Sequence, residues 1–163
     1  GNKMTYLLSS PNFNSLGGML TKHYPRRGIL LFKLLEDIKS SFSSLSIDTC
    51  ESIITYTCGL NHNGLSYDTH KARSEKPGTV ETDLLKLDID SIKVDEKLNP
   101  ILNFINKLTL TPDQITQADV QSIFDAGWDE RAFLDSVYLC AISNCMNCFI
   151  TGLGIKAENQ INQ

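Results

Sequence analysis

The feature that most constrains the fold is a long apolar stretch near the C-terminal end of the sequence. From Arg131 to Ile150 almost every side chain is apolar or small. Asp129 precedes this stretch as a helix-starting residue and Gly152 follows it as a stop, so we predict that residues 129–151 form the longest helix. A helix that is apolar on every side must be buried on every side, either in the middle of a bundle or at a subunit interface. We therefore expect a homo-oligomer, either a dimer, a trimer or a hexamer.

The rest of the chain shows mainly helical periodicity. Leu31, Leu34, Leu35 and Ile38 follow the i, i+3, i+4, i+7 spacing of one helix face, with Pro25 just ahead as a first-turn residue. Cap and turn residues predict the helices at about 28–42, 46–59, 66–76, 81–87, 95–107 and 117–126. No segment alternates like a strand. The prediction is one all-α domain over residues 1–163, with a polar N-terminal arm at 1–13.

Composition excludes several classes of protein. The chain has 163 residues, of which 41% are hydrophobic and 21% charged, and its formal net charge is −4. These values are typical of a globular domain with its own core rather than of a disordered chain. The net negative charge argues against nucleic acid or an anionic membrane as a partner. No apolar run approaches the roughly 20 residues of a membrane span, so we expect no membrane partner.

The cysteines indicate a reducing compartment. Five cysteines are present, in two clusters at Cys50/Cys58 and Cys140/Cys145/Cys148. An odd number in a chain of this size does not match the disulfide framework of a small secreted protein. We expect a cytoplasmic protein.

A carboxylate and an imidazole lie at a fixed distance in the middle of the chain. Glu51 and His70 are separated by enough residues to carry a helix, a turn at Asn63-Gly64 and the first turn of a second helix. Such an arrangement would bring an acid/base pair together at a helix N-terminus. A histidine oriented by a carboxylate can move a proton near neutral pH.

The C-terminal half resembles a known family. The segment TPDQITQADVQSIFDAG at 111–127, followed by DERAFLD at 129–135, is similar to the AhpD-like (alkylhydroperoxidase D-like) group of the carboxymuconolactone decarboxylase superfamily. The resemblance is closest to its peroxidase-related branch, whose final helix reads roughly Asn-Phe-x-Asn-Arg. This chain has Asn144 and Asn147 there, with Cys148 in place of the arginine, and then Gly152-Leu-Gly154. The resemblance spans about residues 24–155 and implies an AhpD-like helical bundle.

The redox motif of that family is incomplete in this sequence. The family has a Glu, a Cys-x-x-Cys twelve residues later and a His four residues past the second Cys. Aligning Glu51 with that Glu places Asn63 and Ser66 at the two Cys positions and His70 at the His position. Serine cannot form a sulfenic acid or a disulfide, so hydroperoxide reduction at this site is not expected. Neither a cofactor nor a metal is expected.

The residues left at this position suggest acid/base chemistry. The decarboxylase branch of the superfamily also lacks the thiol pair, and resemblance to it implies lyase-type work on a small molecule. We interpret Glu51, His70 and Ser66 as catalytic candidates and Asn63, His62 and Tyr67 as binding candidates. Two alternatives stay open at this position: a Glu51–His70 contact that only holds two helices together, and a Ser66 hydroxyl activated by His70.

Two other thiol arrangements compete with this interpretation. Cys58 and His62 have the spacing of the family's second Cys and His, but a thiol near a helix C-terminus is not activated. Cys145 and Cys148 form a Cys-x-x-Cys within the last helix, which would support a thiol peroxidase or antioxidant function. We favour packing for Cys140, Cys145 and Cys148 as small apolar residues of a buried helix. A third hypothesis is a non-catalytic binding or structural protein on the same scaffold.

Overall fold

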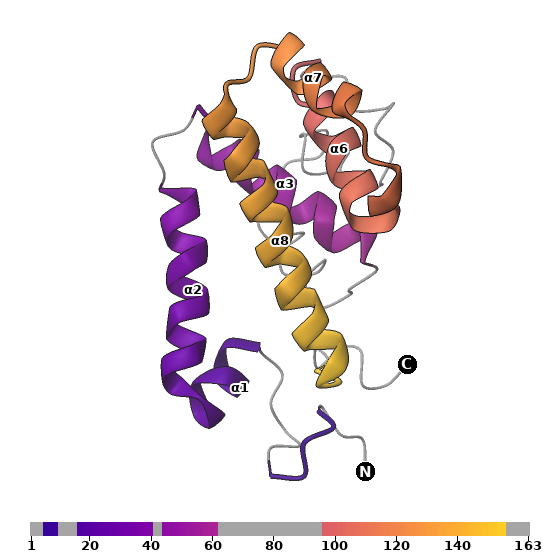
Figure 1. Cartoon of the computed structure of the whole chain (residues 1–163). Coiled ribbons are helices and arrows are strands. Elements are labelled where there is room, and N and C mark those ends of the chain that lie inside the picture. Colours follow the sequence, from indigo (N-terminus) through magenta and orange to yellow (C-terminus); the bar gives the residue numbers. More distant parts are fainter. Residues whose placement is uncertain (1–4, 10–15, 41–43, 62–95, 156–163) are drawn as a thin grey trace, which may run out of the picture.

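The computed structural model describes residues 5–9, 16–40, 44–61 and 96–155 of the chain (Figure 1). Within these ranges the protein is helical and contains no strand. The prediction of an all-α fold is thus confirmed. The helices predicted at 66–76 and 81–87 lie outside the described residues.

Two helices form the N-terminal part of the fold. α1 spans Leu16–His23 and α2 spans Pro25–Lys39. Pro25 occupies the first turn of α2 as predicted, because a proline there lacks only an N–H that has no partner within the helix. Ile38 is buried and Leu31 and Leu35 pack against the core. Leu34 was predicted on the same face, but it is exposed because it lies at the edge of the apolar side.

The central helix is α3, Ile47–Leu60, and every residue from Ser52 to Leu60 is buried. Ser46 caps it, close to the predicted start at residue 46, and its hydroxyl oxygen accepts a hydrogen bond from the Thr49 N–H at 3.1 Å. The buried hydroxyl groups of Ser52 and Thr57 donate to carbonyl oxygens one turn earlier, at 2.9 and 2.8 Å. The hydroxyl groups of Ser52 and Thr57 are therefore paired within this core helix.

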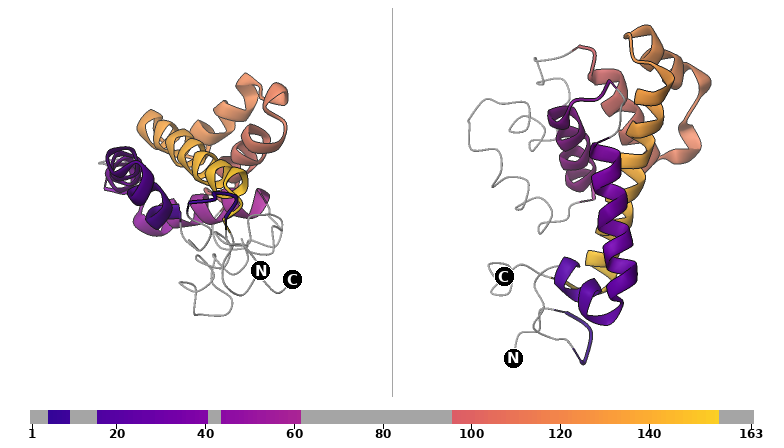
Figure 2. Two further views of the ribbon diagram at one scale, coloured as in Figure 1. Left: turned by 90° about the horizontal axis from the view of Figure 1, so that it is seen from below. Right: turned by 90° about the vertical axis from the view of Figure 1, so that its left-hand side faces the viewer.

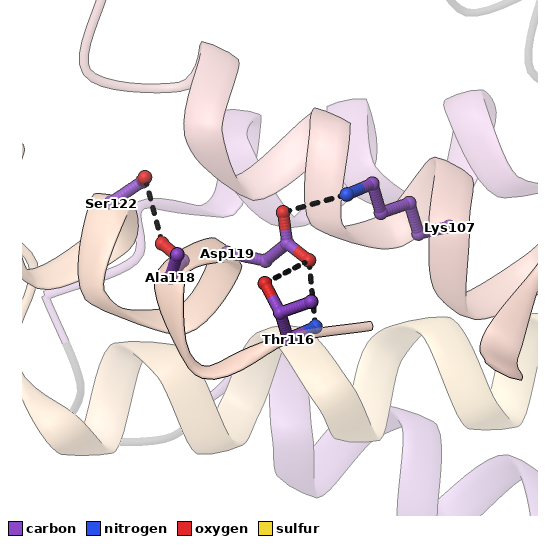
Figure 3. A network of polar contacts seen from close by, with 5 residues as sticks. All are labelled: Lys107, Thr116, Ala118, Asp119 and Ser122. Atoms are coloured by element: carbon purple, nitrogen blue, oxygen red, sulfur yellow. Dashed lines mark hydrogen bonds and ion pairs between the residues drawn. The ribbon is translucent and has the colours of Figure 1, made fainter. Parts of the chain in front are cut away.

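Two consecutive helices follow, of which the first packs on α3 and the second packs on the first. α6 spans Asn99–Leu110 with Pro100 in its first turn, the 3-10 turn η2 spans Pro112–Gln114, and α7 spans Gln117–Asp125. The start of α7 is a capping box, in which the Asp119 carboxylate accepts the Thr116 N–H at 2.8 Å (Figure 3). The other oxygen of the same carboxylate accepts from the Lys107 ammonium at 2.8 Å. This contact fixes α7 to α6.

A tight turn after α7 leads into the last helix. Gly127 has φ +102°, a conformation that side-chain-bearing residues rarely adopt. The indole N–H of Trp128 donates to the Lys97 carbonyl at 2.6 Å, and the ring is largely buried. Trp128 therefore fixes this turn to the core.

α8, Glu130–Gly152, is the longest helix, and the Asp129 carboxylate caps it by accepting the Ala132 N–H at 2.8 Å. It crosses α3 in Figure 1, and seen from below it lies between α2 and α6 (Figure 2). Its inner side, including Leu139, Cys140 and Ile142, belongs to the main core.

Within a single chain α8 is not buried on every side, so the prediction that it lies in the middle of the bundle is wrong. The alternative, burial at a subunit interface, stays a prediction. Leu134, Tyr138 and Phe149 are 52%, 47% and 41% exposed. An apolar composition all round gives no indication of which side faces solvent.

The expectation that no segment is long enough to span a membrane also needs correction. Of the described helices, α8 alone has the length and mean hydropathy of a membrane span, with 39% of that window buried in the structure. Because a core helix of a soluble protein passes the same test, this is weak evidence for a membrane.

Residues 5–9 pack against the C-terminal end of α8, where a simple polar arm was predicted. The Tyr6 N–H donates to the Leu153 carbonyl at 2.8 Å, and Thr5 is buried. Leu7 packs on a small apolar cluster formed by Ile150 and Ile155. This end of the fold is therefore closed by both ends of the described chain.

Candidate functional site

Glu51 lies in the second turn of α3 and faces the end of α2. Its carboxylate forms an ion pair with the Lys39 ammonium in the last turn of α2. The two side chains keep 20% and 25% of their surface exposed, so this pair is at the protein surface and not in the core. Lys39 therefore positions Glu51 and neutralises its charge.

A buried thiol and a further carboxylate lie close to this pair. Burial raises the pKa of the Cys50 thiol, and the negative charges of Asp135 and Glu51 raise it further, against a lowering by Lys39. Asp135 of α8 thus lies close enough to Cys50 to affect its pKa, at the junction of α2, α3 and α8. Cys50 stays protonated at neutral pH and is not a nucleophile.

A groove of about 480 Å³ runs along α2 and reaches the ion pair. Among the described residues, its lining combines apolar and charged side chains and includes Gly28, Ile29, Phe32, Lys33, Leu35, Glu36 and Lys39. Since Lys39 belongs to both the groove and the ion pair, Glu51 lies one side chain away from this space. An apolar wall with a few charged groups is typical of a site for a small molecule.

The remaining predicted residues of this site are not among those described. His70, Ser66, Asn63, His62 and Tyr67 all lie in the range 62–95, outside the described residues. The convergence of Glu51 with His70 therefore stays a prediction, as does the alternative pairing of Cys58 with His62.

Cys58 is buried in the last turn of α3, where its sulfur accepts a hydrogen bond from the Asn147 amide at 3.4 Å. Asn147 also donates to the Ser143 carbonyl at 2.7 Å. A buried thiol at a helix C-terminus lacks the features that activate cysteine.

The cysteines of α8 differ from one another. Cys140 is fully buried, as the packing interpretation predicted, and burial raises its pKa. The same interpretation is wrong for Cys145 and Cys148, which are exposed because they lie on the outer side of the helix. The pKa of the Cys145 thiol is raised by partial burial and by neighbouring Cys148. Both thiols are therefore accessible, and the raised pKa leaves Cys145 without activation.

Two residues at these sites were not predicted from the sequence. Lys39 is the only basic residue in the last turn of α2, a signal that could have paired it with Glu51. Asn147 was noted only through the family resemblance, although a polar residue within an apolar helix signals a buried partner. Within the described ranges, no three His, Cys, Asp or Glu side chains form a metal-binding group.

Comparison with solved structures identifies the fold. One neighbour is described as "alkylhydroperoxidase AhpD core: uncharacterized peroxidase-related protein from Ralstonia eutropha JMP134"; it has a TM-score of 0.65 at 13% identity, over 86% of this chain and 75% of that one. Another is an uncharacterized peroxidase-related protein from Silicibacter sp. TM1040, with a TM-score of 0.71 at 15% identity, over 90% and 85%. The fold is AhpD-like.

This agreement confirms the expected AhpD-like helical bundle. No family profile matches the sequence, and no curated protein matches it. At identities of 13% and 15%, the likeness concerns the AhpD-like fold and leaves the chemistry to be argued from the residues.

Proposed function

We propose that this protein is a diverged relative of the AhpD-like and carboxymuconolactone decarboxylase proteins that binds a small molecule beside Glu51 and acts on it by acid/base chemistry. The observation that carries the proposal is the Lys39–Glu51 ion pair at the border of the α2 groove. It supplies a positioned carboxylate next to a space of suitable size.

His70 would complete the site as the proton carrier. Decarboxylation of a β-keto acid or a carboxylated lactone releases CO₂ and leaves an enolate carbon that must receive a proton. An imidazole can deliver that proton near neutral pH, and a carboxylate can fix its orientation. In this proposal Glu51 orients His70, and Ser66, Asn63, His62 and Tyr67 contribute polar contacts to the ligand.

The thiol environments support this proposal over peroxide reduction. Burial raises the pKa of Cys50 and Cys140, and partial burial that of Cys145. A peroxide-reducing thiol needs the opposite, because the thiolate is the nucleophile. All five cysteines are free, which also supports our proposal of a reducing, cytoplasmic location.

The test compares Glu51→Gln with Glu96→Gln, an exposed glutamate ahead of α6 that serves as a matched control. We expect a panel of β-keto acids and carboxylated lactones to contain compounds that raise the melting temperature of the wild type. Glu51→Gln and His70→Ala should lose that shift, and they should lower the rate of CO₂ release by at least about tenfold. The control should keep both the shift and the rate.

A parallel assay addresses the thiol alternative. Incubation with hydrogen peroxide or an organic hydroperoxide should leave the number of titratable thiols unchanged over the time of a peroxidase assay. Rapid hydroperoxide turnover that is lost in Cys145→Ser or Cys58→Ser would overturn the proposal. Wild-type protein that binds none of the panel would favour the non-catalytic scaffold.

A further inference from the structure

The outer side of α8 carries a continuous apolar surface. Its exposed residues recur at intervals of three or four, as neighbours along one helix face do. We call this surface the α8 stripe; it consists of Leu134, Tyr138, Ala141, Cys145, Cys148 and Phe149. In Figure 1 no described helix passes in front of the α8 ribbon.

The stripe is uncharged over most of its length. Between Ser136 and Ile155 the sequence contains no Asp, Glu, Lys or Arg. Single exposed apolar side chains are ordinary, but a contiguous apolar patch on a soluble domain marks an interaction surface. The stripe extends over about 22 Å, from Leu134 to Phe149, at 1.5 Å per residue.

We propose that a second copy of this chain covers the α8 stripe, with the two α8 helices antiparallel about a two-fold axis near Ala141. In that register Tyr138 of each helix lies opposite the small Cys145 of the other, and Leu134 lies opposite Phe149. The smallest side chain, Ala141, lies at the centre, where the helices come closest. Each Tyr138 ring is therefore matched by a small side chain on the partner helix, and the same contacts form on both sides of the axis, as a symmetric interface requires.

The area of the stripe fits this occupant. Leu134, Tyr138 and Phe149 are each about half exposed. Together with the small residues between them they offer on the order of 500 Å² of apolar surface. A stable interface buries about 800 Å² on each partner, and a homodimer interface is roughly 65% apolar. Each partner must therefore supply about 500 Å² of apolar surface, which matches the area of the stripe.

The charge pattern disfavours a lipid surface as the occupant. Helices that lie on membranes carry Lys and Arg beside the apolar face, where these residues meet the headgroups. Along α8 itself the sequence contains no Lys or Arg after Arg131. An uncharged protein surface such as the stripe itself is a better match.

The first experiment measures mass in solution by sedimentation equilibrium. We expect wild-type protein to form dimers, and Tyr138→Glu to raise the dimer dissociation constant on the order of 100-fold or more, because the substitution enters the interface twice. Leu110→Glu is the matched control, since Leu110 is 53% exposed at the end of α6 and outside the stripe. It should leave the dimer intact. Circular dichroism should show that both variants are folded.

The second experiment tests the antiparallel register by disulfide trapping. Ala141→Cys, in a background with Cys145→Ser and Cys148→Ser, should cross-link two chains under mild oxidation. Native Cys145 should not cross-link, because antiparallel packing separates the two copies by about 10 Å along the helix axis. A monomeric wild type, a dimer unaffected by Tyr138→Glu, or cross-linking through Cys145 instead of position 141 would each overturn the proposal. So would binding of the wild-type stripe to phosphatidylcholine vesicles with no self-association.

Discussion

Gly154 is the residue at which the two ends of the described chain constrain one another. Its φ of +67° lies in the left-handed region, and a Cβ atom there would come within 2.6 Å of the Tyr6 ring. Tyr6 is 70% exposed, so its ring can move aside. The backbone conformation cannot be relieved in the same way, and it is the main reason for glycine at this position.

Gly154→Ala is expected to lower the free energy of unfolding by about 1–2 kcal/mol, the cost of a left-handed alanine. Gly154→Asn should cost less, because asparagine tolerates this conformation. The control is Gly152→Ala in the last turn of α8, where a Cβ would have no neighbour within 4 Å. That change should be neutral or stabilising by up to about 1 kcal/mol. Urea unfolding measures all three, and equal losses at both positions would contradict the explanation.

At the scale of elements, the junction of α6 and α7 depends on one carboxylate. Asp119 accepts from Lys107 of α6 and from the Thr116 N–H at the start of α7 (Figure 3). The Lys107 hydrogen bond, followed by that of the Thr116 N–H, holds the pKa of the Asp119 carboxyl below its ordinary value. A depressed pKa means that the ionised form stabilises the fold. This contribution is present above the ordinary carboxyl pKa of about 4 and is lost as the pH falls through the depressed value.

Asp119→Asn should therefore be less stable than the wild type at pH 7, and the difference should shrink as the pH falls below about 4. Urea denaturation across this pH range measures it. Asp113→Asn, on the neighbouring 3-10 turn, is the control and should show no such convergence. A stability difference that is independent of pH would show that the Asp119 charge is not the cause.

Helix boundaries were predictable where a local side chain determines them. Asp129 occupies the cap position expected from the sequence, and α3 and α7 begin close to the predicted residues 46 and 117. A cap depends on residues within one turn, and here Ser46 and Thr116 supply it. The packing of residues 5–9 and the exposed side of α8 were not predictable in this way. Both depend on contacts between segments that are distant in sequence, and an all-apolar helix does not indicate its outer side.

At the scale of the whole molecule, the cysteines divide between the core and the surface. Cys50, Cys58 and Cys140 are buried, whereas Cys145 and Cys148 are exposed. Of the candidate site, the sequence predicted Glu51 but not its partner Lys39, since pairing across two helices requires the packed fold. The odd number of cysteines could not distinguish the two groups either.

We expect two thiols of the native protein to react quickly with a thiol reagent such as Ellman's reagent, at protein concentrations low enough to favour the monomer. The other three should react only on unfolding, because burial shields them and keeps Cys50 and Cys140 protonated. The double variant Cys145→Ser, Cys148→Ser should lack the fast phase. Fast reaction of three or more native thiols would contradict this division.

The position of Trp128 determines what fluorescence can report. It is the only tryptophan in the chain, and it packs at the α7–α8 corner with the Lys97 ammonium 4.3 Å from its ring centroid. Its emission will therefore follow the opening of that corner and will be insensitive to events at Tyr6, at the opposite end of α8. If residues 5–9 detach before the helices unfold, Trp128 fluorescence will not detect this step, whereas amide hydrogen exchange will.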